Sequence, residues 1–94
     1  MRVKWLRPAL QDLDDASEFI AADRPRRALG FLESVFSSVE HLTKFPALGR
    51  PGRIPGTREL IVPRTPYIIP YRVSGDFIEI LAVLHAAREW PDQF

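Results

Sequence analysis

The sequence contains no cysteine and no long apolar run. Without a thiol among its 94 residues, the chain can form neither a disulfide framework nor a thiolate metal site. No apolar stretch approaches the ~20 residues that a membrane-spanning helix requires. The start of the chain, Met1–Trp5, has no apolar segment of the kind found in signal peptides. We therefore expect a soluble protein of the cytoplasm with no membrane partner.

Acidic residues are scarce in one part of the chain. Between Gly49 and Arg72 the only acid is Glu59. The arginines of that stretch are Arg50, Arg53, Arg58, Arg64 and Arg72. Because the net charge of the whole protein is only +1, this stretch is locally cationic, which favours an anionic partner for one surface. A merely solubilising surface is the alternative interpretation.

Metal-ligand patterns are also missing. His41 has no acidic companion at ligand spacing. The acids between residues 12 and 18 spread over one polar helix face, so we interpret them as a solvated surface. The sequence therefore predicts no metal site and no cofactor.

Two amphipathic helices are predicted in the first half. Apolar residues from Ala9 to Ile20 recur at helical spacing, and Pro8 suits a first helical turn. A second helix is expected to run from Asp23, its N-cap candidate, to about Lys44. The apolar residues of both helices are expected in the core, and they include Leu10, Phe19, Leu29, Phe31 and Phe36. The short link predicts an antiparallel hairpin.

The second half alternates with a period of two, which is typical of strands. A short strand is expected near Val3, and three more at Thr57–Val62, Tyr67–Val73 and Phe77–His85. Pro70 predicts an irregularity, because proline cannot donate to a ladder of backbone hydrogen bonds. The fold class is therefore α+β in the order β-α-α-β-β-β, with the helical hairpin on one face of a mainly antiparallel small sheet. The 94 residues form a single domain, residues 1–94.

An ordered series of motifs follows the helices. The motifs are Phe45–Arg50, Pro55–Leu60, Pro66–Tyr67, Tyr71–Val73 and Ile80–Pro91. Together with the hairpin, this series resembles the RelE/ParE superfamily of bacterial toxins over nearly the whole chain. The resemblance implies the toxin of a type II toxin–antitoxin system, which inhibits growth and is neutralised by a small antitoxin that is partly disordered when free.

The resemblance leaves two activities open. RelE-like toxins cut mRNA on the ribosome without a metal ion, whereas ParE-like toxins inhibit DNA gyrase and are not known as nucleases. The fold alone does not distinguish these two activities. The sequence leaves it uncertain whether the protein is an enzyme; we favour mRNA cleavage, with the gyrase inhibitor as the alternative.

Metal-free RNA cleavage needs a base, an acid and cations that stabilise charge on the phosphate. The candidate catalytic residues are Arg72, His85 and Arg58, which three neighbouring strands could bring onto one surface. By resemblance, Arg72 in Tyr71–Val73 matches a phosphate-binding arginine, and His85 lies near a catalytic histidine of some nucleases. The candidate substrate-binding residues are Arg50, Arg53 and Arg88.

Several features argue against this site. The loop before residue 57 has arginines where RelE has lysines, and no tyrosine follows the last strand. His85 could be an ordinary strand-end residue, and Arg72 could pair with Asp76 or Glu79 across the turn. The gyrase interpretation is also incomplete, because Ala86 and Ala87 follow His85 where ParE-like chains often have a Met-Asp or similar pair.

Overall fold

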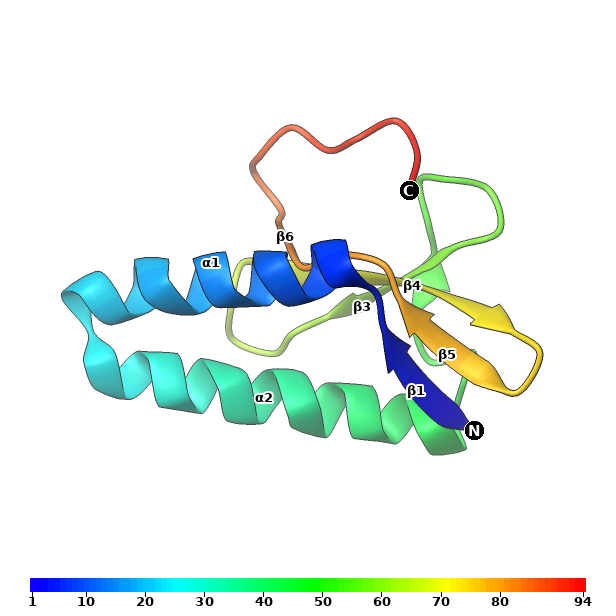
Figure 1. The fold of residues 1–94 in the computed structure, drawn as a ribbon, viewed down its shortest axis with the longest axis horizontal. Helices are drawn as coiled ribbons and strands as arrows, with labels where there is room; N and C mark the ends of the chain where they lie inside the picture. Colours follow the sequence, from blue (N-terminus) through cyan, green and yellow to red (C-terminus); the bar gives the residue numbers. More distant parts are fainter.

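Two antiparallel helices cover one face of the sheet (Figure 1). The computed structural model describes residues 1–94. Helix α1 spans Arg7–Asp23 and helix α2 spans Pro25–Lys44, each with a proline in its first turn. Helix α1 therefore continues through Asp23, and the predicted N-cap is wrong because Arg24 occupies that position. None of the helices is long and apolar enough to cross a membrane.

The core lies between the hairpin and the sheet. Ala9, Leu13 and Ala16 of α1 face Val35 and Leu42 of α2 and the apolar side chains of the strands. The core prediction is wrong for four residues, which are exposed by 47–65%: Leu10, Phe19, Leu29 and Phe36. They lie beside the buried stripes at helical spacing, but only one side of each helix faces the sheet. The sequence pattern alone therefore predicted apolar stripes wider than the buried ones.

The sheet contains six strands, of which five follow the order β1-β5-β4-β3-β2. Their bounds are β1 Arg2–Trp5, β2 Arg50–Pro51, β3 Arg58–Ile61, β4 Tyr67–Ser74, β5 Phe77–Ile80 and β6 Leu84–His85. Strand β1 pairs with β5 in parallel, and the other pairs are antiparallel. The predicted α+β class is confirmed. The two-residue strand β2 lies in what the sequence predicts to be a loop.

The last predicted strand is interrupted opposite Pro70 of β4, the residue at which an irregularity was predicted. Leu81 N–H donates to Pro70 O at 3.0 Å, but proline has no N–H to return the second bond of that pair. The chain then leaves the ladder and rejoins β4 as β6. Tyr71 opposes Ile80 before the break, whereas Ile68 opposes Leu84 after it. Residues 81–83 therefore oppose residues 69–70, a bulge of one extra residue.

The bulge moves every later side chain of the last strand to the other face. Val83 joins Ile78 and Ile80 in the core, although strict alternation predicts it on the opposite face. His85 likewise opposes Tyr67, a core residue. The prediction of one continuous strand over Phe77–His85 is therefore wrong. His85 does not lie on the face of Glu79, where strict alternation would place it.

Tyr71 anchors the segment between α2 and β2. Its side chain is fully buried, and its hydroxyl accepts from Gly49 N–H at 2.9 Å and donates to Pro46 O at 2.7 Å. A Cβ at Gly49 would lie 2.6 Å from the Tyr71 ring, so this close approach requires glycine. Burial raises the pKa of Tyr71, and the Gly49 bond opposes this effect.

Replacing Tyr71→Phe should lower the free energy of unfolding by about 1–3 kcal/mol, because Gly49 N–H is left buried without a partner. Urea unfolding would measure the change. Tyr67→Phe is the matched control, since Tyr67 is also buried but its hydroxyl makes no hydrogen bond within the protein. Equal losses in both variants would contradict the anchoring role.

Asp12 of α1 supports the bulge. Its Oδ2 accepts from Val83 N–H at 3.0 Å, a backbone donor that the broken ladder leaves free. Desolvation raises the pKa of Asp12 above its usual 3.8, the Val83 bond lowers it, and nearby Asp15 raises it further. The half-buried carboxylate therefore binds the bulge at an electrostatic cost.

Because the pKa of Asp12 is raised on folding, its contribution to stability is largest below pH 3.8 and is lost as the pH rises through the raised pKa. Asp12→Asn keeps an acceptor without the charge, so its stability relative to the parent should increase between pH 3 and pH 7. Asp12→Ala should instead lose about 1–3 kcal/mol at either pH, because Val83 N–H loses its partner.

Unfolding curves at both pH values would measure these differences, with exposed Asp14→Asn as the control for loss of one charge. A pH-independent difference between Asp12→Asn and the parent would contradict the assignment.

Candidate functional site

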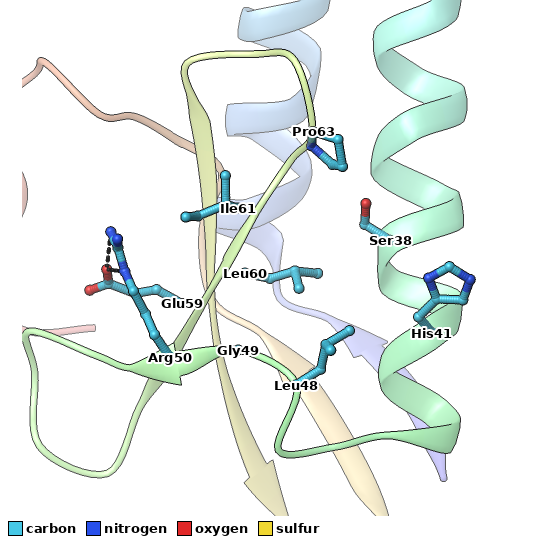
Figure 2. Close-up of a pocket in the computed structure, with 9 residues that line it drawn as sticks. All are labelled: Ser38, His41, Leu48, Gly49, Arg50, Glu59, Leu60, Ile61 and Pro63. Carbon is cyan, nitrogen blue, oxygen red and sulfur yellow. Dashed lines mark hydrogen bonds and ion pairs between the residues drawn. The ribbon is translucent and has the colours of Figure 1, made fainter.

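The sheet face that no helix covers carries a cluster of arginines around Glu59. This carboxylate is only 3% exposed. It accepts from Arg50 Nε and Nη2 at 3.2 and 3.1 Å and from Arg53 N–H at 2.8 Å, and Arg53 Nε lies 3.8 Å away. Figure 2 shows Arg50, Glu59 and Ile61 pointing away from α2. Two half-exposed guanidinium groups thus share one buried carboxylate, which leaves a surplus positive charge on this face.

Arg72 lies on the same face. Its Nε donates to Glu79 Oε1 at 2.9 Å, across the β4–β5 pair in which these two residues are directly opposite. The side chain of Arg72 is partly exposed and that of Glu79 is mostly covered. The pairing with Glu79 that the sequence offered as the ordinary role of Arg72 is therefore present.

Arg58 lies on the other face. It opposes Tyr71, whose ring is in the core, and its Nη1 donates to Gly49 O at 2.7 Å and to Ala47 O at 3.4 Å. Its guanidinium therefore closes the edge of the segment that Tyr71 anchors. That role is structural, and no substrate is needed to explain it.

His85 is the third predicted catalytic residue. It shares the helix-covered face with Tyr67, and the two rings meet edge to face with centroids 5.3 Å apart. Its Nδ1 accepts from Ala87 N–H at 3.1 Å, and its carbonyl accepts from Trp90 Nε1 at 3.2 Å. Because Nδ1 accepts this hydrogen bond, Nε2 is the ring nitrogen that remains available for another contact.

The predicted grouping of these three residues is wrong. Arg72 lies on the helix-free face, whereas Arg58 and His85 lie on the other face. Arg58 opposes Tyr71 and His85 opposes Tyr67. These two tyrosines are four residues apart, or about 13 Å along β4. Two physical reasons separate them: alternation along β3 puts Arg58 on the face of Tyr71, and the bulge opposite Pro70 moves His85 to that same face, away from Arg72.

The predicted substrate-binding arginines are also separated. Arg50 and Arg53 lie together at Glu59, and the Arg53 guanidinium stacks over the Trp90 ring at 3.6 Å. Arg88 lies 5.7 Å from the ring of Phe19 on α1. Substrate binding by these residues stays a prediction.

A second cationic site lies at the tip of the hairpin, and the sequence did not indicate it. A groove of about 690 Å³ runs between α1, α2 and the β3–β4 turn. Its charged lining consists of Arg26, Arg27 and Arg64, with His85 at one end and no acidic residue. None of the three arginines forms an ion pair. Arg26 and Arg27 are neighbours in sequence, but Arg64 lies 37 positions after Arg27, so only the folded chain brings it to them.

A smaller cleft separates α2 from the edge of the sheet. It has a volume of about 390 Å³, and Figure 2 shows Ser38 and His41 of α2 across from Leu60 of β3. No group of three or more metal-ligating side chains occurs in the chain. The other titratable residues of its lining, Arg50 and Glu59, pair with each other and point away from α2 (Figure 2), so His41 is the one histidine of the cleft.

A two-helix hairpin on a small mixed sheet is the architecture of the RelE/ParE superfamily of type II toxins. The sequence profile described as "ParE toxin of type II toxin-antitoxin system, parDE" matches residues 3–90. The chain belongs to this family of toxins and is the toxin component of a type II toxin–antitoxin system. The resemblance found in the sequence is confirmed.

Two relatives of the chain carry the word toxin in their names. Y4kP of Sinorhizobium fredii is 46% identical over 90 residues, which is 96% of this chain and 93% of that protein. Toxin RelE2 of Caulobacter vibrioides is 29% identical over 87 residues, covering 93% of this chain and 97% of that protein. A relative named RelE therefore aligns along nearly the whole domain that the ParE profile matches.

Solved structures give the same result. The chromosomal ParDE toxin–antitoxin system of P. aeruginosa superposes with a TM-score of 0.81 at 33% identity, covering 90% of this chain and 95% of that chain. The toxin–antitoxin complex RelBE2 of Mycobacterium tuberculosis superposes with a TM-score of 0.60 at 26% identity, covering 89% and 95%.

Proposed function

We propose that this toxin stops growth by binding its target without cutting a bond, and that the target is DNA gyrase in the cytoplasm. The separation of Arg58, Arg72 and His85 carries the proposal. A metal-free nuclease must place its proton-transfer groups and its cation within hydrogen-bond reach of one phosphate. Residues on opposite faces of a sheet cannot meet that requirement.

The contacts of each residue support the same conclusion. Arg72 is neutralised by Glu79 and Arg58 donates through Nη1 to carbonyl oxygens, so both arginines already have partners within the protein. Neither is a suitable proton carrier, because arginine stays charged. The separation of these residues removes the support that the sequence offered for mRNA cleavage, and the match to the ParE profile supports the alternative, gyrase inhibition.

Expression of the chain alone should arrest growth while cellular transcripts stay intact and cleaved chromosomal DNA accumulates. The purified toxin should inhibit supercoiling by gyrase. Transcript mapping, DNA gels and a supercoiling assay would measure these outcomes. Ribosome-dependent cuts in transcripts that disappear in Arg72→Ala or His85→Ala would overturn the proposal and establish RNA cleavage. Absence of any growth defect would instead indicate a non-toxic binding module.

We also propose that a cognate antitoxin binds this toxin with an acidic segment in the hairpin groove. The groove has three unpaired arginines and no acid, so its charge complements such a segment. Phe31 and Tyr67 form its floor, and Phe19, which is 65% exposed, stands at its rim. Apolar side chains of a segment that folds on binding would cover these rings.

The backbone at Arg64 supports this assignment. Arg64 has φ 60°, a left-handed conformation that costs an L-residue about 1–2 kcal/mol relative to its usual regions. Glycine or asparagine would suit the turn better. An arginine occupies this unfavourable backbone position although its side chain forms no ion pair within the chain.

Replacing Arg26, Arg27 and Arg64 together by glutamine should weaken antitoxin binding roughly 10- to 100-fold, because each lost charge pair at a rim contributes about 0.5–1 kcal/mol. The loss should shrink at high salt. Calorimetric titration would measure it. The matched control replaces Arg2, Lys4 and Arg7, which removes the same charge from the other end of the molecule. Equal losses in both triple variants would contradict a specific groove.

A further inference from the structure

The last nine residues, Ala86–Phe94, cross the helix-free face of the sheet. We call this segment the strap. In Figure 1 it leaves β6 beside α1 and turns back, so that the C-terminus ends next to the loop between β2 and β3. The strap contains no helix or strand. Something other than regular structure must therefore hold it in place.

The strap has few attachments, and Trp90 makes the farthest of them. At its base, Ala86 N–H donates to Pro66 O at 2.8 Å. Farther along, Trp90 Nε1 donates to His85 O at 3.2 Å, and the Trp90 ring lies under the Arg53 guanidinium at 3.6 Å. Residues 91–94 make no hydrogen bond or ion pair. Arg88 also lies 5.7 Å from the ring of Phe19 on α1. Among hydrogen bonds, ion pairs and cation–π contacts, the Arg53–Trp90 stack alone joins the strap to the β2–β3 loop.

The strap crosses apolar residues that no helix covers. Ile68 is 5% exposed, and Pro70 is fully buried. Both lie on the face opposite the core, and neither is part of the main core cluster. Ile68 opposes Leu84, next to the base of the strap, and Pro70 opposes Glu59, which binds Arg53. Trp90 contacts His85 of β6 on one side of this strip and Arg53, which binds Glu59 of β3, on the other, so its side chain bridges the strip.

We propose that the strap is a reversible cover of this face, latched by the Arg53–Trp90 stack. Its release exposes an apolar strip formed by Ile68, Pro70 and Leu84, which adjoins the already exposed Ile61 and has Arg72 beside it. The rest of the fold does not depend on the cover, because the main core lies on the other face. The proposal is independent of the toxin's target.

The latch is weak enough to open within the native state. Arg53 is half-exposed, and an exposed cation–π contact of this kind changes an equilibrium about two- to fivefold. Losing the guanidinium should therefore raise the ratio of open to closed strap by about that factor. Opening of this kind is local and costs less than global unfolding.

Fluorescence can measure the latch, because the chain has only two tryptophans. In a Trp5→Phe background, Trp90 is the only indole emitter. Acrylamide quenching of Trp90 should rise in Arg53→Gln. Arg50→Gln is the matched control: it removes the same charge from the same Glu59 carboxylate but does not touch Trp90. Quenching that is equal in the two variants would overturn the latch.

A second measurement uses the absence of cysteine. An Ile68→Cys thiol would be the only one in the protein, and its alkylation rate would report exposure of the covered strip. The rate should increase about two- to fivefold when Arg53→Gln is added and stay unchanged with Arg50→Gln. Alkylation only at the rate of global unfolding, measured in parallel, would show that the strap does not open by itself and would overturn the proposal. Leu84→Cys provides the same readout should Ile68→Cys fail to fold.

Discussion

The fold depends on one missing backbone donor. Pro70 lies in the longest strand, β4, at the position where its N–H would complete the pair with Leu81. The last strand therefore leaves the ladder and returns one residue out of step, as β6. Asp12 accepts the Val83 N–H that the break frees. A helix and two strands are thus coupled at the point where the sheet is least regular.

The same break decides which face of the sheet His85 occupies. A continuous strand would have placed it on the face of Arg72 and Glu79, but six residues, or about 20 Å, along the strand from Glu79. The extra residue turns the imidazole toward Tyr67 instead. One residue of strand register therefore changes the surroundings of a titratable side chain while the rest of the sheet is kept.

Much of the architecture could be predicted, because the helices and strands have strong local signals. The two helices, the central strands, the irregularity at Pro70 and the ordinary pairing of Arg72 with Glu79 all follow from periodicity and turn chemistry. The faces after the bulge could not be predicted, since one residue of slippage leaves no local pattern. The groove of Arg26, Arg27 and Arg64 was missed for a related reason: Arg64 meets the other two only in the tertiary structure.

The pairing of β1 with β5 has a consequence for biosynthesis. Arg2 opposes Phe77, so the first strand to be made joins the sheet 75 positions later, counted from residue 2 to residue 77. Such distant partners make folding slow relative to local helix formation. A nascent chain that has emerged only through its helical hairpin lacks β4 and β5 and hence the sheet against which the hairpin packs. Incomplete translation products of this gene should therefore be harmless, because the native domain is assembled only near the end of synthesis.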